Sequence, residues 1–595
     1  MSEGEKAQTM MDAEFHIGAW LVQPRINTVS MQNQSVRLEP KAMQVLVHLA
    51  EHAGEVVPKE RLIGSVWPET FVTDDVLTRA ISGLRRIFCD DPKVPQVIQT
   101  IPKAGYRLIA AITPVESPSR RIHSLLVLPF ANQSAEPDAD YLSDGITECL
   151  INVLSQLPQL KVVARSTAFR FKGTDRDPAA IARELDVGAV VTGRIVLWNG
   201  SVSVQAELVD PLTGSQHWGH RWTRPRGNLL CLPENLARDI AENLKVQVSG
   251  EQRQLMSRQP TARPEAYQLY LKARYLYHQG TEESVKKAIQ VFEQATGLDA
   301  EYAVAYAGLA DCHTFLTCQL DYGAVSPRIG ASLAESAARR ALELDGQLAA
   351  GHSALGSIFK NYRWDWEASE REFRAAIELS PSYPKARQAY ADLLLALGRF
   401  DEALGQIAAA HDIDPFSVTI NTDYGFTLYM VRDYTRAVHR LKLTLDLRPD
   451  YIPARSLLSF VLERAGAPRE AAEEYQRALA LTQGREVPMA VLGRVLSAGH
   501  EEELRSGIEL LRTWTERRYV PACWFAALYT RLGEADLAFQ WMERALEERS
   551  NWLIYLLVDP LFDELRSDAR FPKLVERVGL PAGGKPRPQR EGSPP

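Results

Sequence analysis

The 595-residue chain contains only six cysteines, and no two of them have the spacing of a CxxC pair. Thiols this few and scattered exclude a disulfide-stapled secreted domain and a cysteine-based zinc site. The chain also lacks any run near the ~18 apolar residues that a membrane helix needs. Its first residues lack the apolar core of a signal peptide. We therefore expect a cytoplasmic protein without membrane contact.

Common enzyme signatures are missing as well. The sequence has no GxxxxGK[ST] loop, no GxGxxG motif, no HExxH and no GxSxG. Asp144 and Glu148 are interpreted as helix-cap or solvent-facing residues. His217 and His220 are three apart on a predicted strand, so they face opposite ways and suit a metal poorly. The sequence predicts no enzyme activity, no cofactor and no metal ion.

What is present points to several folded domains. The chain is too long for one hydrophobic core, and its 45% hydrophobic and 24% charged residues are ordinary for globular proteins. Because the net charge is −7, nucleic-acid binding would need a local basic patch. Composition shifts predict domains at residues 14–112, 123–250 and 264–580. A disordered tail rich in proline, glycine and charge is predicted at 581–595.

The C-terminal half repeats itself every 34 residues. Prolines recur at this interval at Pro381, Pro415 and Pro449, and alanines do so at Ala403, Ala437 and Ala471. Each alanine begins a second helix, where a small side chain lets the paired helix approach. The pattern resembles the tetratricopeptide repeat, which implies an all-α solenoid with a concave groove.

The groove offers two interpretations. The resemblance implies capture of a peptide or protein partner, whereas the array could also only space or dimerise the protein. The sequence leaves both open. An insertion near 320–330 lengthens one repeat, and residues 485–515 fit the pattern poorly.

The N-terminal segment has a different pattern. Short strands are predicted in FHIGAWLVQ and QSVRLEP. A hairpin with a turn at Pro102–Gly105 is predicted in QVIQTIPKAGYRLIA. Thr73 is expected to cap the third of three helices. These helices run from Pro40 to Gly54, from the Val57–Glu60 stretch to Trp67, and from Asp74 to Phe88.

The third helix has an apolar face and a polar, basic face. Its apolar residues recur at i, i+3, i+4 and i+7 and must face the core. A helix of this diameter fits the DNA major groove, where arginine binds guanine edges or phosphates. The first 113 residues carry 12 basic and 13 acidic side chains, so a solvated helix face is the alternative. The outward residues are Thr78, Arg79, Ser82, Arg85 and Arg86.

Helix, turn, helix and terminal hairpin is the order of a winged helix–turn–helix. The phrases LEPKAMQVLVHLAEHAGEVVPKERLIGSVW, ISGLRRIF and QTIPKAGYRL resemble the effector domain of OmpR/PhoB-type bacterial regulators, in particular the CadC-like branch. The resemblance implies that the third helix reads promoter DNA, often as tandem copies. It implies wing contacts by Lys103, Tyr106 and Arg107. Many relatives have a wing arginine where this chain has Pro102, so Lys103 would replace it.

Between these parts, strands and helices alternate in the order βαβαβββα, which predicts a mixed α/β domain. The phrases LLVLPFANQS, YLSDGITECLINVLSQL and ELVDPLTGSQHW resemble the TolB-N-terminal-like domain. Such domains occur between DNA-binding or cyclase domains and tetratricopeptide arrays. The resemblance assigns no chemistry to these residues, and a nucleotide-related activity would rest on that association alone.

The sequence thus predicts a multidomain protein with an N-terminal winged helix–turn–helix (α+β), a middle α/β domain and a C-terminal tetratricopeptide solenoid. The predicted function is a DNA-binding transcriptional regulator controlled by a ligand or partner at the repeats. Self-association on DNA and contact with RNA polymerase through the Trp67–Thr73 loop are further expectations. The alternative is a tetratricopeptide scaffold or signalling adaptor whose winged helix contacts protein.

Overall fold

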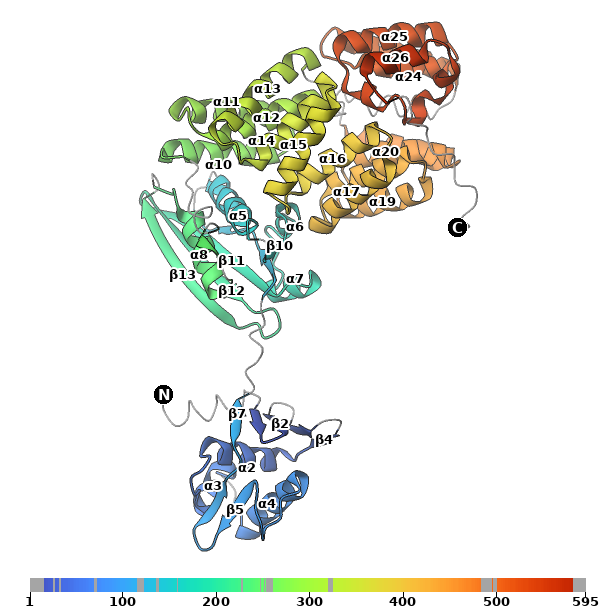
Figure 1. Ribbon diagram of the computed structural model, residues 1–595. Helices are drawn as coiled ribbons and strands as arrows, with labels where there is room; N and C mark the ends of the chain where they lie inside the picture. Colours follow the sequence, from blue (N-terminus) through green and yellow to red (C-terminus); the bar gives the residue numbers. More distant parts are fainter. Residues whose placement is uncertain are drawn as a thin grey trace. The chain divides into compact units, whose positions relative to one another are not determined.

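The chain forms two compact units, residues 1–121 and 122–595 (Figure 1). The computed structural model describes residues 15–24, 27–31, 34–68, 72–114, 122–134, 139–157, 159–225, 228–244, 246, 248–250, 252, 261–318, 325–482, 495 and 500–581. The predicted tail from 582 onward lies outside the described residues. So do residues 319–324 of the predicted insertion and most of 483–499.

The N-terminal unit combines three helices, a sheet and a hairpin. Helices α2 (Pro40–Glu51), α3 (Lys59–Val66) and α4 (Asp74–Phe88) confirm the three predicted ones. Strands β5 (Ile98–Ile101) and β6 (Gly105–Leu108) form the predicted hairpin. The sheet has the antiparallel order β4-β3-β2-β1-β7. Its strands are β1 (Phe15–Ile17), β2 (Trp20–Gln23), β3 (Thr28–Met31), β4 (Gln34–Arg37) and β7 (Ile112–Pro114).

Two details of this unit differ from the sequence analysis. Strands β3 and β7 were not predicted, and β7 pairs Thr113 and Pro114 with β1. The sheet therefore continues two residues past 112, where the N-terminal domain was expected to end. Thr73 does precede α4, but its side chain makes no capping hydrogen bond.

The core of the N-terminal unit forms on the apolar face of α4. Leu77, Ile81, Leu84 and Phe88 are buried, as the helical spacing predicts. The ring of Phe88 packs edge-on against Trp20 of the sheet, with 5.7 Å between the ring centroids. Burial of this stripe fixes which side of α4 faces outward.

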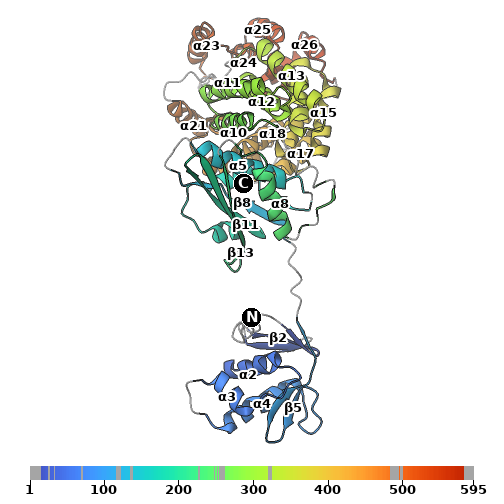
Figure 2. The ribbon, with the colours of Figure 1, turned by 90° about the vertical axis from the view of Figure 1, so that its left-hand side faces the viewer.

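The second unit begins with a mixed sheet of order β10-β8-β11-β12-β13, in which short β9 also pairs with β11. Strands β8, β10 and β11 are parallel, and β11, β12 and β13 are antiparallel. This arrangement confirms the predicted α/β class, and Figure 2 shows α5 and α8 beside the sheet. The elements are β8 (Ser124–Val127), β9 (Ala131–Asn132), α5 (Asp140–Leu154), β10 (Lys161–Val162), α6 (Arg165–Phe169), α7 (Pro178–Glu184), β11 (Ala189–Trp198), β12 (Ser201–Val209), β13 (Gln216–Pro225) and α8 (Leu232–Asn243).

Paired helices follow, and they confirm the predicted repeat. Helices α16, α18 and α20 begin 34 residues apart, at Pro384, Val418 and Ile452. The repeated alanines are fully buried, so each second helix packs closely on its neighbours. The helices are α10 (Pro264–His278), α11 (Glu282–Leu298), α12 (Ala303–Cys318), α13 (Pro327–Leu344), α14 (Ala349–Ile358) with the π-helical turn η3 (Phe359–Arg363), α15 (Trp366–Leu379), α16 (Pro384–Ala396), α17 (Phe400–Ile413), α18 (Val418–Met430), α19 (Tyr434–Leu447), α20 (Ile452–Arg464) and α21 (Pro468–Leu481).

A C-terminal group of helices packs back on the array. Trp366 of α15 donates its indole N–H to the carbonyl of Gly579 at 2.7 Å. Tyr555 hydrogen-bonds Asp392 of α16. This group, called the C-terminal module below, comprises α23 (Glu501–Thr515), α24 (Ala522–Arg531), α25 (Ala535–Glu548), η4 (Asn551–Tyr555), η5 (Pro560–Ser567) and α26 (Phe571–Val578).

The sheet domain and the repeats are joined by a buried ion cluster. Glu148 of α5 accepts hydrogen bonds from Arg165 of α6 at 3.0 Å and from Arg274 of α10, whose Nε also lies 3.0 Å away. His278 of α10 lies 3.0 Å from the same carboxylate. Figure 1 shows α10 next to α5, and Gly145 of α5 permits this approach, because a Cβ there would lie 2.9 Å from Leu271.

The cluster corrects the expectation that Asp144 and Glu148 cap a helix or face solvent. Both are buried in the middle of α5, and Asp144 pairs with Lys172 at 2.8 Å. Burial by itself would raise the pKa of Glu148, but the basic side chains around it hold that pKa well below its usual range. The cluster therefore contains a carboxylate and at least two cations at neutral pH.

We predict that Glu148→Gln lowers the free energy of unfolding of the second unit by about 3–5 kcal/mol, since it removes the carboxylate that two largely buried guanidinium groups share and leaves Arg274 only its longer contact of 4.0 Å with Asp311. Urea unfolding of the full chain measures the change. Glu283→Gln is the matched control, because Glu283 lies on the exposed surface of α11 and pairs only with Lys287 among the contacts the structure gives it. Equal unfolding curves for the two variants would contradict the role given to the cluster.

Candidate nucleic-acid interface

The outward face of α4 carries most of the residues predicted to meet DNA. Thr78, Arg79, Ser82 and Arg86 are exposed. At 3.6 residues per turn these four side chains leave the helix within an arc of about 100°. The hydroxyl of Thr78 donates to the carbonyl of Asp74 at 2.8 Å, so it is already used within the helix. The two arginines are the cationic groups available on this face.

Arg85 has a different position from its neighbours. Its side chain is 13% exposed, and its guanidinium donates at 2.8 Å to the carbonyl of Ile98 and to the hydroxyl of Thr100. Both acceptors belong to β5. Arg85 therefore joins α4 to the hairpin instead of extending outward with Arg79 and Arg86.

Asp90, just after α4, holds the loop that leads into the hairpin. Its carboxylate accepts from the backbone N–H groups of Gln96 at 2.5 Å, Val97 at 3.0 Å and Ile98 at 2.8 Å. It also lies 3.9 Å from Nε of Arg85. Asp90 is only 6% exposed, so it satisfies three donors in a largely dry site. The sequence analysis did not single out this residue.

The hairpin is fixed on its other side by the loop between α2 and α3. Tyr106 and Val57 exchange two backbone hydrogen bonds of 2.8 and 3.0 Å. Gly105 makes this approach possible, because its φ is +144° and a Cβ would lie 2.0 Å from the carbonyl oxygen of Val57. The ring of Tyr106 is 4% exposed and belongs to the core of the unit.

The remaining wing residues are accessible to different degrees. Lys103 is exposed at the hairpin turn, where its φ is +64°. Arg107 is half-buried on β6. Lys103 therefore lies in the hairpin turn that the sequence predicted, and Arg107 is only partly accessible on β6. The ring of Tyr106 lies in the core, and the guanidinium of Arg85 lies between α4 and the hairpin. Neither side chain therefore has the outward position that the sequence analysis gave it.

Acidic residues at the start of α4 are partly neutralised. Asp74 pairs with Lys59 of α3 at 2.7 Å. The pair is exposed, so its contribution to stability is small. It nevertheless offsets part of the negative charge at the start of α4. Glu69 to Phe71, in the Trp67–Thr73 loop that was predicted to contact polymerase, lie outside the described residues.

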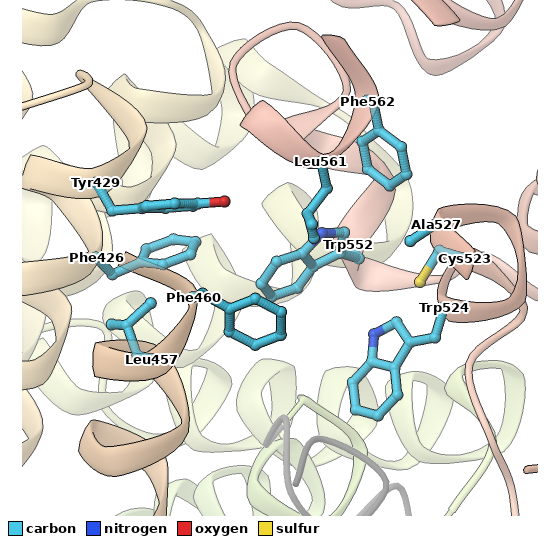
Figure 3. A pocket seen from close by; sticks show the side chains of 10 residues that line it. All are labelled: Phe426, Tyr429, Leu457, Phe460, Cys523, Trp524, Ala527, Trp552, Leu561 and Phe562. Carbon is cyan, nitrogen blue, oxygen red and sulfur yellow. The ribbon is translucent and has the colours of Figure 1, made fainter. Parts of the chain in front are cut away.

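The repeat region offers a less open surface than a solenoid groove suggests. Phe426 of α18 packs against Trp552 and Tyr555 of the C-terminal module, with ring centroids 5.7 and 5.3 Å apart. Figure 3 shows the small apolar cavity at this contact, which also involves Phe460 of α20. Its volume is about 20 Å³, which leaves no room for anything larger than a water-sized group. The C-terminal module therefore covers this part of the first helices of the repeats.

No helix in the described part of the chain combines the length and the hydropathy that a bilayer crossing requires.

Comparison with known families decides the nature of the N-terminal unit. Residues 33–108 match the family described as transcriptional regulatory protein, C terminal, and residues 365–417 match the tetratricopeptide repeat. The N-terminal domain is a winged helix of the OmpR/PhoB type. In this winged helix, α4 is the helix that follows the turn and β5–β6 is the wing. The match to the second family confirms the tetratricopeptide repeats; the TolB-N-like resemblance of the middle domain stays a prediction.

Several curated proteins are similar to parts of the chain. The transcriptional activator CadC of Escherichia coli is 39% identical over 104 residues, which is 17% of this chain and 20% of CadC. The transcriptional regulator HilA of Salmonella paratyphi A is 25% identical over 386 residues, 64% of this chain and 67% of HilA. A putative adenylate cyclase 3 of Rhizobium meliloti is 29% identical over 247 residues, 42% of this chain and 41% of that protein. The chain thus spans less than half of CadC and of the putative cyclase.

We predict that Asp90→Ala loosens the joint between α4 and the wing. Three backbone N–H groups, two of them buried, lose a charged acceptor, which should lower the unfolding free energy of the N-terminal unit by about 3 kcal/mol. Hydrogen–deuterium exchange at the amides of residues 96–98 should become faster. The matched control is Asp91→Ala, because Asp91 is exposed and its carboxylate accepts only from the amide of Lys93 among its given hydrogen bonds. Unchanged exchange in Asp90→Ala would contradict this role.

Proposed function

We propose that the protein is a sequence-specific DNA-binding transcriptional regulator. The observation that carries the proposal is the outward face of α4, where Arg79 and Arg86 are exposed on a helix whose opposite face is buried in the core. An α-helix fits the major groove, and guanidinium groups bind guanine O6 and N7 or phosphate oxygens. The resemblance of the N-terminal domain to CadC supports this assignment.

In this proposal the two arginines make the principal contacts. Ser82 lies between them along the helix and binds a base edge or a phosphate. Thr78, whose hydroxyl donates to the Asp74 carbonyl, adds an apolar contact through its methyl group at the start of the stripe. Lys103 at the hairpin turn meets the neighbouring backbone or minor groove, with Arg107 beside it. Arg85 acts as a positioning residue, because its hydrogen bonds to β5 set the angle between helix and wing. We leave Tyr106 out of the interface, since its ring is in the core.

The second unit is proposed to receive the signal. A peptide or protein partner binding the repeats would change self-association of the protein on promoter DNA, and polymerase contact through the Trp67–Thr73 loop would follow. The C-terminal module is part of this input surface, because it already packs on α16 and α18. We propose no enzyme activity and a location with the chromosome in the cytoplasm, as a promoter-binding role requires.

A scaffold whose winged helix binds protein is the second candidate. The near balance of 12 basic and 13 acidic residues in the first 113 favours it, because most DNA-binding domains are strongly basic. The two functions differ in their dependence on salt. DNA binding releases counterions and weakens steeply as salt rises, whereas binding to a protein surface of mixed charge depends on salt more weakly.

We predict that Arg79→Ala with Arg86→Ala reduces affinity for DNA from the gene's own upstream region by about tenfold to a hundredfold per arginine, as expected for ~1–3 kcal/mol each. The slope of log K against log salt should become shallower by about 1 for each phosphate that an arginine no longer binds. Fluorescence anisotropy of labelled duplex over a salt series measures both quantities.

Arg37→Ala is the matched control, because Arg37 is an exposed arginine on β4 and belongs neither to α4 nor to the wing. It should bind DNA like the original protein. Full affinity in the double variant would exclude α4 as the reading helix. A wild-type complex that is insensitive to salt would favour the scaffold function.

A further inference from the structure

Three potential metal ligands gather at the C-terminal end of α2. His48, Glu51 and His52 each direct a ligand atom to one place, and these atoms lie within 4.8 Å of one another. Their spacing of i, i+3 and i+4 puts them on one face of the helix. All three are half-buried. The cluster lies in the winged helix but belongs to neither α4 nor the wing.

The ring of His52 is oriented as in known metal sites. Its Nδ1 lies 3.0 Å from the backbone carbonyl oxygen of His48. Because a carbonyl oxygen only accepts, Nδ1 is the donor, and in the neutral ring Nε2 keeps its lone pair. A metal-binding histidine usually donates its other N–H to such an oxygen, which fixes the tautomer and ring orientation. His52 is therefore set up to bind through Nε2.

His48 and Glu51 are placed as neighbouring ligands would be. Nδ1 of His48 lies 3.5 Å from Oε2 of Glu51. Two ligands bound about 2.1 Å from a tetrahedral ion are separated by roughly 3.4 Å. Nε2 of His48 is buried without a hydrogen-bond partner among the described residues, so no described protein group fixes the tautomer of this ring. The imidazole rings of His48 and His52 are 4.8 Å apart between centroids.

The end of a helix also favours a cation at this position. The cluster occupies the last turn of α2, where the unpaired carbonyls carry partial negative charge. The side chains of His48 and Glu51 are 16% and 10% exposed, so the site is shielded from solvent and its charge interactions are weakly screened. The sequence analysis looked for cysteine pairs and HExxH and so did not weigh the His-x-x-Glu-His order of residues 48–52.

We propose that His48, Glu51 and His52 bind a first-row divalent transition-metal ion such as Zn²⁺, with the remaining coordination positions filled by water. Two imidazoles and a carboxylate are a ligand set that suits these ions and excludes a preference for Ca²⁺ or Mg²⁺, which take oxygen ligands. The loop after α2 pairs with the wing, since Gly54 donates to the carbonyl of Leu108 at 2.9 Å. His52 stands two residues before Gly54 in the chain.

The test measures Zn²⁺ binding to the full chain by competition with a chromogenic chelator. Because other histidines of the chain add background sites, the original protein is compared with the double variant His48→Gln, His52→Gln. The original protein should bind one Zn²⁺ more than the double variant. Glu51→Gln should keep the site and weaken it at least tenfold. His16→Gln, a histidine on β1 in the same unit, is the matched control and should bind like the original.

A second measurement covers the case in which the double variant fails to fold. Zn²⁺ should raise the urea midpoint of the N-terminal unit in the original protein and in His16→Gln, and less in Glu51→Gln, which keeps both rings. Equal stoichiometry in the original and a folded double variant overturns the proposal. So does a zinc-induced shift in midpoint that is the same with and without the Glu51 carboxylate.

Discussion

The carboxylate of Asp90 is the constraint on which the proposed DNA-binding surface depends. It accepts from three consecutive backbone N–H groups that lead into β5, the last of them at Ile98, and lies beside Arg85, which in turn hydrogen-bonds β5 itself. Together these contacts fix the wing relative to α4. A helix in the major groove and a wing on the adjacent backbone must match the spacing of a duplex, so a loose joint would lose binding free energy to conformational entropy. The buried carboxylate of Asp90 thus helps to position the wing relative to the exposed arginines of α4.

In the second unit, too, a buried charged residue joins two parts of the structure. Charged residues at the contact between α5 and α10 are paired inside the structure, and Glu148 is the common partner of Arg165 and Arg274. Replacing Glu148 removes the shared counter-charge of both arginines, so this carboxylate holds the sheet domain and the first repeat together. At the C-terminal end of the second unit, the C-terminal module covers part of the first helices of the repeats. A partner of the repeats would meet this module as well as the helices.

Periodicity was sufficient to predict α4 and the paired helices of the repeats, but not where their long side chains end. The apolar stripe of α4 and the 34-residue step of the repeats both specify buried faces, and both are confirmed. The same pattern counted Arg85 as outward, because a helical wheel gives the direction in which a side chain leaves the helix and not where its guanidinium ends. Tyr106 was misplaced because backbone pairing with Val57 turns its strand toward the core.

Other features had no signal in a single sequence. Strands β3 and β7 are short, and their pairing depends on partners distant in the chain. The position of Glu148 in the predicted helix was compatible with exposure to solvent, and its burial results from the packing of α5 against α10. Asp90 follows the helix as one of two adjacent aspartates, and only the fold distinguishes it from exposed Asp91.

The central claim is that α4 reads the major groove. Dimethyl sulfate methylation of bound promoter DNA tests it directly, because the reagent attacks guanine N7 in the major groove and adenine N3 in the minor groove. The account predicts guanines protected at N7 within each bound half-site, with that protection abolished when Arg79 and Arg86 are replaced. Guanines that stay fully reactive while adenine N3 alone is protected would contradict it.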